Sequence, residues 1–222
     1  MLKVLVALGA QNVRSDQLAD ALWPHVDADY AHKSFTTTLH RLRRILEDEE
    51  ALILRETRLS LNPKLCWVDT WALDGLIAEI DVALRDPRPR AMEPAVRNLV
   101  DEALALYRGP FLPDESEQPS YIGCREQIRA RLLRCVTRVS RAWEDAGMAD
   151  AAADCYLRLI DADPLFEAPY RNLMLNYQRR GDRAEARAIY ERLRTLLATK
   201  LKTMPTSETQ AVYAALADPA PR

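Results

Sequence analysis

The first third of the chain carries apolar residues at helical spacing, interrupted by short polar segments. An apolar run over residues 2–8 predicts a first helix, which Gly9 would end. Ser15 is predicted to cap a second, short amphipathic helix that continues through residues 17–23 and ends at Pro24. Two short helices therefore precede the most strongly patterned segment of the chain.

That segment is a longer helix, predicted over about residues 32–46 after a polar loop at 25–31. Its apolar residues repeat at i, i+4, i+7 and i+11 and form a single stripe, which we expect to face the core. They are Phe35, Leu39, Leu42 and Leu46. Two short apolar-rich runs follow, at 52–55 and 58–61, and the two residues between them predict a β-hairpin, although the turn lacks an Asn-Gly or Asp-Gly pair.

The middle of the chain, residues 69–119, is predicted to hold two helices. The first covers about residues 69–84 and the second about residues 93–107. The segments outside these helices are a proline-rich connector and an acidic loop, residues 85–90 and 113–119.

The last hundred or so residues contain an internal repeat. Identical or similar residues lie 34 residues apart, which is the period of the tetratricopeptide repeat. The pairs are Trp143 and Tyr177, Gly147 and Gly181, Ala152 and Ala186, Tyr156 and Tyr190, and Leu159 and Leu193. About three such units are needed to bury a continuous core, so the helices of the middle segment are expected to supply another layer. A capping helix from Thr206 to about Leu216 and a frayed tail, 218–222, complete the prediction.

Composition narrows the range of functions. The net charge of −2 is unlike that of a generally basic nucleic-acid coat, so any DNA binding must come from a local patch. The apolar runs are too short for a membrane span or a signal peptide, and we expect a cytoplasmic protein. The four cysteines lack metal-ligand spacing and are expected to be buried free thiols. With six glycines and none of the phosphate-loop or nucleophile motifs, we expect no cofactor, no metal and no catalysis.

A local basic patch is present on the helix at 32–46. No acidic residue occurs between Asp29 and Glu47. Opposite the apolar stripe the helix presents Lys33, Thr36, Thr37, His40, Arg41 and Arg44, with Arg43 at the border. An α-helix fits the major groove, where arginine can pair with guanine and the smaller polar side chains can reach phosphates or base edges. The order helix, turn, helix, hairpin is that of a winged helix, and Arg55 and Arg58 flank the hairpin turn, close to where a minor groove would lie.

Two further interpretations remain open beside DNA binding. A basic face on an amphipathic helix is often merely solvated, and then the chain would be a protein-interaction adaptor with a vestigial head. A second basic run could hold a small effector such as a nucleotide between repeat helices, or could simply pair with acidic residues of neighbouring helices. Its members are Arg125, Arg129, Arg131, Arg134 and Arg138.

Several motifs resemble one bacterial regulator family. The head, at residues 20–24, 31–35 and 39–46, resembles the OmpR-type winged helix of SARP-type and MalT-like transcriptional regulators. The remainder resembles the bacterial transcriptional activator domain that follows such heads. The marks of that domain are residues 68–71, 106–112, 163–165 and 190–193.

The resemblance implies a mainly α protein, with a winged helix-turn-helix at 1–68 and a TPR-like helical repeat domain at 69–222. It implies that the helix at 32–46 reads double-stranded DNA through Thr36, Thr37, His40, Arg41 and Arg44, and that the hairpin is the wing. The repeat domain would mediate dimerisation, contact with RNA polymerase or response to a signal. Because such heads normally begin with a small antiparallel sheet before the first helix, we expect a truncated head or a piece of a longer, multidomain regulator.

Overall fold

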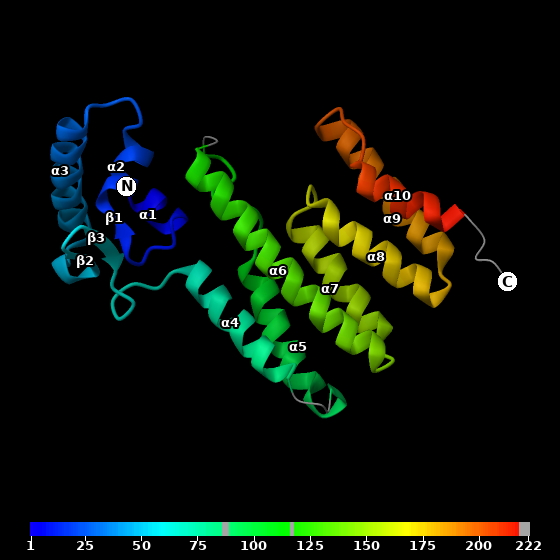
Figure 1. Ribbon diagram of the computed structural model, residues 1–222. Coiled ribbons are helices and arrows are strands. Elements are labelled where there is room, and N and C mark those ends of the chain that lie inside the picture. The colour runs from blue at the N-terminus through cyan, green and yellow to red at the C-terminus, as the bar shows by residue number, and fades with distance from the viewer. Residues whose placement is uncertain (86–88, 116–117, 218–222) are drawn as a thin grey trace. The chain divides into compact units, whose positions relative to one another are not determined.

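The computed structural model of the chain is mainly helical, with one small sheet (Figure 1). It describes residues 1–85, 89–115 and 118–217, and side chains over 1–85, 94–115 and 118–216. Parts of the predicted connector, of the acidic loop and of the C-terminal tail, at 86–88, 116–117 and 218–222, lie outside these residues. Among the described residues, no helix is both long enough and apolar enough to cross a bilayer.

The chain divides into two compact units. The first consists of Met1–Ala72 and Phe111–Arg129, and the second of Leu73–Pro110 and Ala130–Arg222. The predicted boundary between residues 68 and 69 stays a prediction, since the first unit also takes in a later segment of the chain.

The first unit opens with the predicted helices. They are α1 (Leu2–Ala7), α2 (Ser15–Leu22) and α3 (Ala28–Leu46). The prediction of Ser15 as an N-cap is wrong: Arg14 occupies that position, with an extended backbone and no side-chain cap. Ser15 is instead the first helical residue, and its N–H donates to the carbonyl oxygen of Thr57 at 2.7 Å. The strand pairing therefore decides where α2 begins.

Helix α3 begins four residues before the predicted start. The Asp27 side chain accepts a hydrogen bond from the Asp29 N–H at 2.8 Å and caps the helix there. The predicted loop at 25–31 is therefore wrong beyond Asp27. Of the predicted stripe, Phe35 and Leu39 are buried. The two later members of the stripe, Leu42 and Leu46, are only half-buried.

The hairpin is present and belongs to a three-stranded antiparallel sheet. Its strands are β2 (Leu52–Arg55) and β3 (Arg58–Leu61), preceded by a 3-10 turn at Glu49–Ala51. The sequence reading missed the third strand, β1 (Val13–Arg14), which pairs with β3 to give the order β1-β3-β2. A strand of two residues is too short to show an alternating pattern.

The later segment of the first unit is held to its N-terminal part. Lys3 forms an ion pair with Glu115, and the Phe111 and Tyr121 rings meet edge to face at 6.2 Å. The Arg125 guanidinium donates to the carbonyl oxygen of Phe111 at 2.7 Å. Of these contacts, the Lys3–Glu115 ion pair joins residues 111–129 to the N-terminal part of the unit, and the other two hold the segment itself together.

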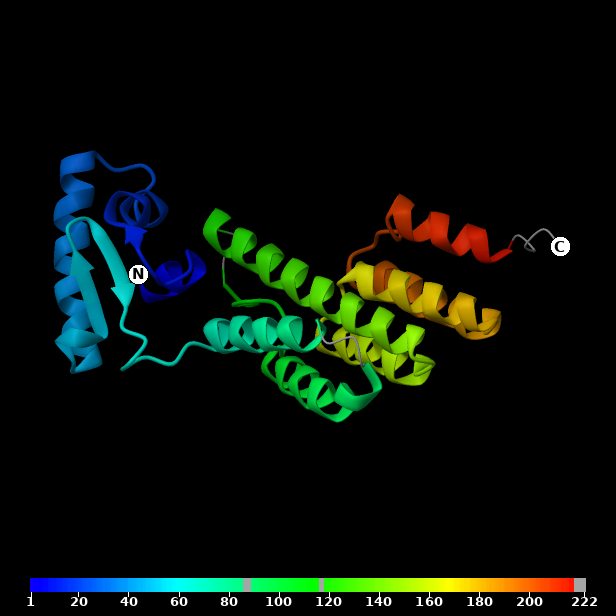
Figure 2. The same cartoon turned by 60° about the horizontal axis from the view of Figure 1, so that its bottom comes forward.

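The second unit stacks antiparallel helices. Its elements are α4 (Asp69–Ala83), α5 (Pro89–Leu106), α6 (Pro119–Asp145), α7 (Ala149–Ala162), α8 (Glu167–Arg180), α9 (Arg183–Lys200) and α10 (Ser207–Ala217). The first residues of α4, up to Ala72, and those of α6, up to Arg129, belong to the other unit. Figure 2 shows α4 and α6 side by side, and ion pairs of Arg131 with Asp74 and Arg138 with Asp81 join them.

Several positions matched by the 34-residue repeat have the same structural role. Ala152 and Ala186 are fully buried, and Leu159 and Leu193 likewise. Gly181 ends α8 in the left-handed conformation, with φ 82°, and Gly147 adopts φ 78° after α6. The repeat therefore specifies where each helix turns and where paired helices touch.

Three of the four cysteines are buried free thiols, and Cys66 is half-buried. Burial raises the pKa of the Cys135 thiol to about 11 and that of Cys155 to about 12.

Candidate nucleic-acid interface

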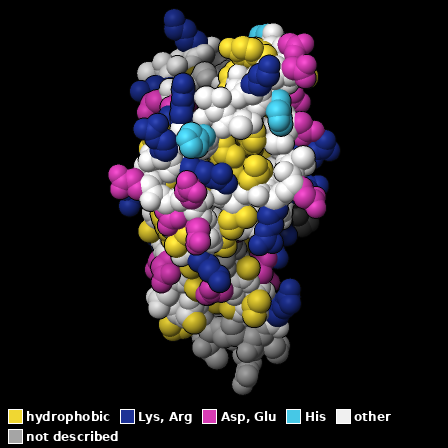
Figure 3. Space-filling view, turned by 90° about the vertical axis from the view of Figure 1, so that its left-hand side faces the viewer, with side chains coloured by type: hydrophobic (Ala, Val, Ile, Leu, Met, Phe, Trp, Pro, Cys, Tyr) yellow, Lys and Arg dark blue, Asp and Glu magenta, His cyan; other side chains and the backbone are white. Residues whose placement is uncertain are grey.

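Helix α3 separates an apolar face from a polar, basic one. The apolar face, with Ala31, Phe35 and Leu39, is buried in the head. The residues predicted to lie opposite the apolar stripe are all exposed on the other side. They are Lys33, Thr36, Thr37, His40, Arg41 and Arg44. Figure 3 shows the side of the molecule on which α3 lies, with basic and histidine side chains gathered over its upper part.

The cations of this face are not neutralised within the head. Among the described residues, Lys33, Arg41 and Arg44 have neither an ion pair nor a side-chain hydrogen bond. Other basic residues of the same unit do: Arg14 pairs with Asp16, and Lys3 with Glu115. Three free cations on a stretch of helix with no acidic residue between Asp29 and Glu47 create a local positive potential that the net charge of the chain conceals.

Arg43 is placed differently from the other predicted contacts. It is half-buried, and its Nη2 donates to the carbonyl oxygen of Leu52 at 3.0 Å. It therefore links α3 to the start of strand β2. Its Nε is buried and has no partner in the part of the chain that the structure describes. Such a residue fixes the angle between helix and hairpin and leaves the exposed face to its neighbours.

The hairpin places two arginines directly opposite each other. Arg55 and Arg58 are cross-strand partners, both exposed, on either side of the turn. The Arg58 Nη1 donates to the carbonyl oxygen of Asn12 at 3.0 Å, whereas Arg55 has no partner among the described residues. Like charges at opposed positions weaken a hairpin. A free guanidinium at this tip is thus unfavourable for stability and available to an anion.

One exposed residue of α3 was missed from the sequence. Tyr30 is 63% exposed and lies three residues before Lys33 and seven before Thr37, on the same face of the helix. The sequence reading put it in a loop. The capping potential of Asp27 was the signal that could have extended the helix to include it.

The hydroxyl of Thr36 is already engaged. It donates to the carbonyl oxygen of His32 at 3.1 Å, one turn earlier in the helix. In this rotamer Thr36 can accept a hydrogen bond from a ligand but does not offer it a proton.

The second basic run, on α6, does not converge on one point. Arg125 bonds to backbone oxygens of residues 111 and 112, Arg129 pairs with Glu126, and Arg131 and Arg138 pair with acidic residues of α4. Arg131 and Arg138 thus show the pairing with a neighbouring helix that the sequence left open, whereas Arg129 pairs within its own helix and Arg125 binds backbone oxygens. The arrangement offers no set of converging donors to a compact phosphate.

Comparison with known proteins decides the family. The bacterial transcriptional activator domain matches residues 68–217. The chain belongs to this family. "Transcriptional regulatory protein MoaR1" of Mycobacterium tuberculosis is 28% identical over 217 residues, which is 96% of this chain and 69% of that protein. "Regulatory protein AfsR" of Streptomyces griseus is 26% identical over 211 residues. The match covers 94% of this chain and 21% of that protein.

A solved structure shares the fold. Mycobacterium tuberculosis EmbR, in complex with a low-affinity phosphopeptide, superposes with a TM-score of 0.59 at 22% identity. The match covers 96% of this chain and 57% of that one. The chain is thus a SARP-like transcriptional regulator with a bacterial transcriptional activator domain, and its relatives extend beyond it in length.

Proposed function

We propose that this regulator binds double-stranded DNA through α3, in a head that is a winged helix with α2 and α3 as the helix-turn-helix and β2–β3 as the wing. The observation that supports the proposal most directly is the set of free cations on the exposed face of α3. A family of transcription regulators gives that face a purpose, because DNA binding by a chain of net charge −2 must come from a local basic patch.

The side chains divide into three roles. Lys33, Arg41 and Arg44 supply charge, and the two arginines can also form bidentate pairs with guanine. Thr37 and His40 lie among these cations and can reach phosphates or base edges. Tyr30 extends the same face toward the N-terminus of the helix. Arg55 enters the minor groove or contacts a phosphate beside it. Arg43 and Arg58 hold the helix and the hairpin in place.

One head makes too few contacts for tight binding. Roughly four to six phosphate contacts give a strongly salt-dependent but weak complex at physiological salt. We therefore propose that two heads act together, as a homodimer or on tandem sites. The repeat helices then serve dimerisation, contact with RNA polymerase or response to a signal, and the outcome at the promoter is activation.

The test starts from a duplex selected from a randomised library by the wild-type protein. Fluorescence anisotropy then compares the selected duplex with an unselected one at two salt concentrations. Arg41→Ala and Arg44→Ala are expected to weaken binding to the selected duplex by about 1–3 kcal/mol each, and a lost phosphate contact to reduce the salt slope by about one.

The matched control is Arg187→Ala, which removes an exposed arginine of α9 and should leave both affinities unchanged. Equal binding by Arg41→Ala, Arg44→Ala and the control would refute the assignment of α3. Failure of the wild type to select any duplex would favour the interaction adaptor instead.

A further inference from the structure

A stripe of arginines runs along the exposed face of α6 in the second unit. Arg134, Arg138 and Arg141 follow one another at i, i+4 and i+7 and therefore share one face of the helix. The opposite face, with Val136 and Val139, is buried. The stripe is thus the solvent-facing side of a helix whose other side is core.

Polar contacts tie both flanks of this stripe to neighbouring helices. On one flank Arg138 pairs with Asp81 of α4. On the other, the Asn172 side chain of α8 donates to the Thr137 hydroxyl at 3.0 Å. The face between these flanks remains open, and among the described residues Arg134 and Arg141 have no ion pair.

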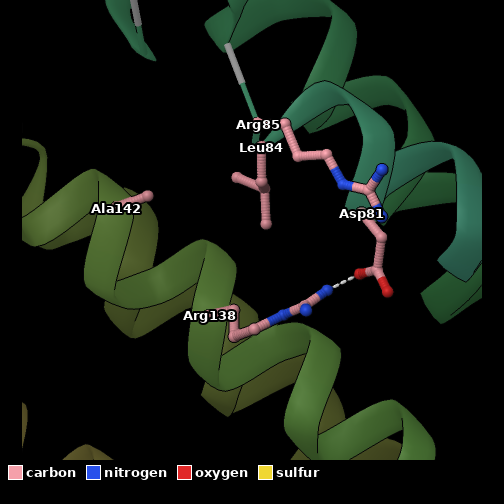
Figure 4. Close-up of a pocket in the computed structure, with 5 residues that line it drawn as sticks. All are labelled: Asp81, Leu84, Arg85, Arg138 and Ala142. Atoms are coloured by element: carbon pink, nitrogen blue, oxygen red, sulfur yellow. Dashed lines mark ion pairs between the residues drawn. The ribbon is translucent and has the colours of Figure 1, made fainter. Parts of the chain in front are cut away.

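A cleft of about 300 Å³ adjoins the stripe (Figure 4). It is lined by Asp81, Leu84, Arg85, Arg138 and Ala142. In the close-up, Leu84 points into the cleft from the turn that follows α4, facing Ala142 of α6, while the two arginines lie beside Asp81. Because Asp81 already neutralises Arg138, the charge left for a ligand is that of Arg85, which is exposed and has no ion pair within the described part of the chain.

We propose that this surface binds an acidic, extended segment of a partner protein, with one apolar side chain seated in the cleft between Leu84 and Ala142. Carboxylates of the segment contact Arg134, Arg141 and Arg85. This proposal is independent of DNA binding by α3, since it uses other residues in the other unit.

The spacing of the cations favours a peptide over a compact ligand. Arg134 and Arg141 are separated by seven residues, or about 10 Å along a helix. A peptide in the extended polyproline II conformation advances about 3.1 Å per residue with about three residues per turn. Its carboxylates three residues apart therefore lie on one face and are separated by about 9 Å, close to the spacing of the two arginines. A nucleotide in the cleft would meet only the cations at its rim, and its phosphates would lie beside the carboxylate of Asp81.

The probes are two labelled peptides of equal length. One repeats Asp-Glu-Leu, which places carboxylates three residues apart with an apolar side chain between them, and the other is the neutral repeat Asn-Gln-Leu. Fluorescence anisotropy with the full chain is expected to show binding of the acidic peptide about tenfold or more tighter than the neutral one, with affinity falling as salt rises.

Variants locate the site. The double variant Arg134→Gln/Arg141→Gln should lower the affinity for the acidic peptide about tenfold. Arg187→Gln on α9 should leave that affinity unchanged. Ala142→Leu fills the cleft. It should therefore lower the affinity for the Asp-Glu-Leu peptide and leave the affinity for an Asp-Glu-Gly peptide, which has no apolar side chain to seat there, unchanged. Thermal melting confirms that each variant folds, and the salt dependence of the wild type is a readout that needs no variant.

Three results would overturn the proposal. The first is equal affinity of the wild type for the acidic and neutral peptides. The second is a response of Arg134→Gln/Arg141→Gln no larger than that of Arg187→Gln. The third is loss of duplex DNA binding or of ATP binding by the same double variant, which would identify the surface as a nucleic-acid or nucleotide site. Loss of peptide binding with DNA affinity intact would support it.

Discussion

A buried hydrogen bond between two distant family motifs gives the sharpest stability prediction. The Tyr107 hydroxyl donates to Asp163 Oδ2 at 2.8 Å, and both side chains are almost fully buried. Tyr107 follows α5 and Asp163 follows α7, so the bond joins two helix ends that are far apart in the sequence. Tyr107→Phe removes the donor and keeps the ring. A hydrogen bond to a charged group contributes about 1.5–3 kcal/mol, and we expect the free energy of unfolding to fall by that amount.

The assay is urea unfolding followed by circular dichroism, with calorimetry to resolve separate transitions of the two units. Tyr213→Phe is the matched control. The Tyr213 ring stacks on Tyr190 with centroids 3.8 Å apart, and its hydroxyl has no hydrogen bond among the described residues. That substitution also keeps the ring and should change stability by less than about 0.5 kcal/mol.

Equal effects of Tyr107→Phe and Tyr213→Phe would refute the reasoning. A double-mutant cycle with Asp163→Asn adds a second check, because the coupling energy isolates the contact between the two side chains. A coupling energy near zero would show that the loss arises elsewhere in the packing.

Two further predictions concern backbone strain and thiol reactivity. Glu47 and Glu56 adopt φ 56° and φ 54°, in the left-handed region that favours glycine. Glu47→Gly and Glu56→Gly should therefore each raise the free energy of unfolding, measured by urea titration, by about 0.5–1 kcal/mol. A loss of stability at both sites would contradict the presence of backbone strain. Burial raises the pKa of the Cys135 and Cys155 thiols to about 11 and about 12, whereas Cys66 is only half-buried. Mass spectrometry after mild alkylation of the native protein below about pH 9 should therefore find Cys66 modified first. Labelling of Cys135 or Cys155 at the same rate as Cys66 would contradict this prediction.

The repeat was the most predictable part of the fold. A spacing of 34 residues located the small residues at which paired helices meet, such as Ala152 and Ala186, because close approach of two helices admits few alternatives. The reason for other motif residues was not visible in the sequence. Tyr107 and Gly109 belong to one of the family motifs, but their role depends on residues far along the chain. A Cβ at Gly109, where φ is 138°, would lie 3.4 Å from the carbonyl oxygen of Ala162.

The main helices and the hairpin of the head were predictable from the sequence, but the short strand, the start of α3 and the contact between helix and hairpin were not. Strand β1 is defined by its pairing with β3, a long-range contact that a two-residue strand does not announce. Helix α3 begins after its N-cap Asp27, four residues before the predicted start. The late predicted start left Tyr30 out of the candidate face. Arg43 was placed at the border of the basic face by helical geometry, but only the position of the Leu52 carbonyl shows that its guanidinium turns toward the hairpin.

A free cation is weak evidence for a ligand, since exposed arginines without an ion pair also occur on α9, at Arg183 and Arg187. What separates the two proposed surfaces from α9 is their surroundings. Glu185 and Glu191 are interleaved with the α9 arginines and keep the local potential low, whereas α3 has no acidic residue after Asp29. On α6 the acidic neighbour Asp81 is already paired, and a cleft with Leu84 and Ala142 in its lining adjoins the stripe. Arg187 is therefore a fair control for both surfaces: it matches the exposure of the proposed contacts and lacks the environment that should make them bind.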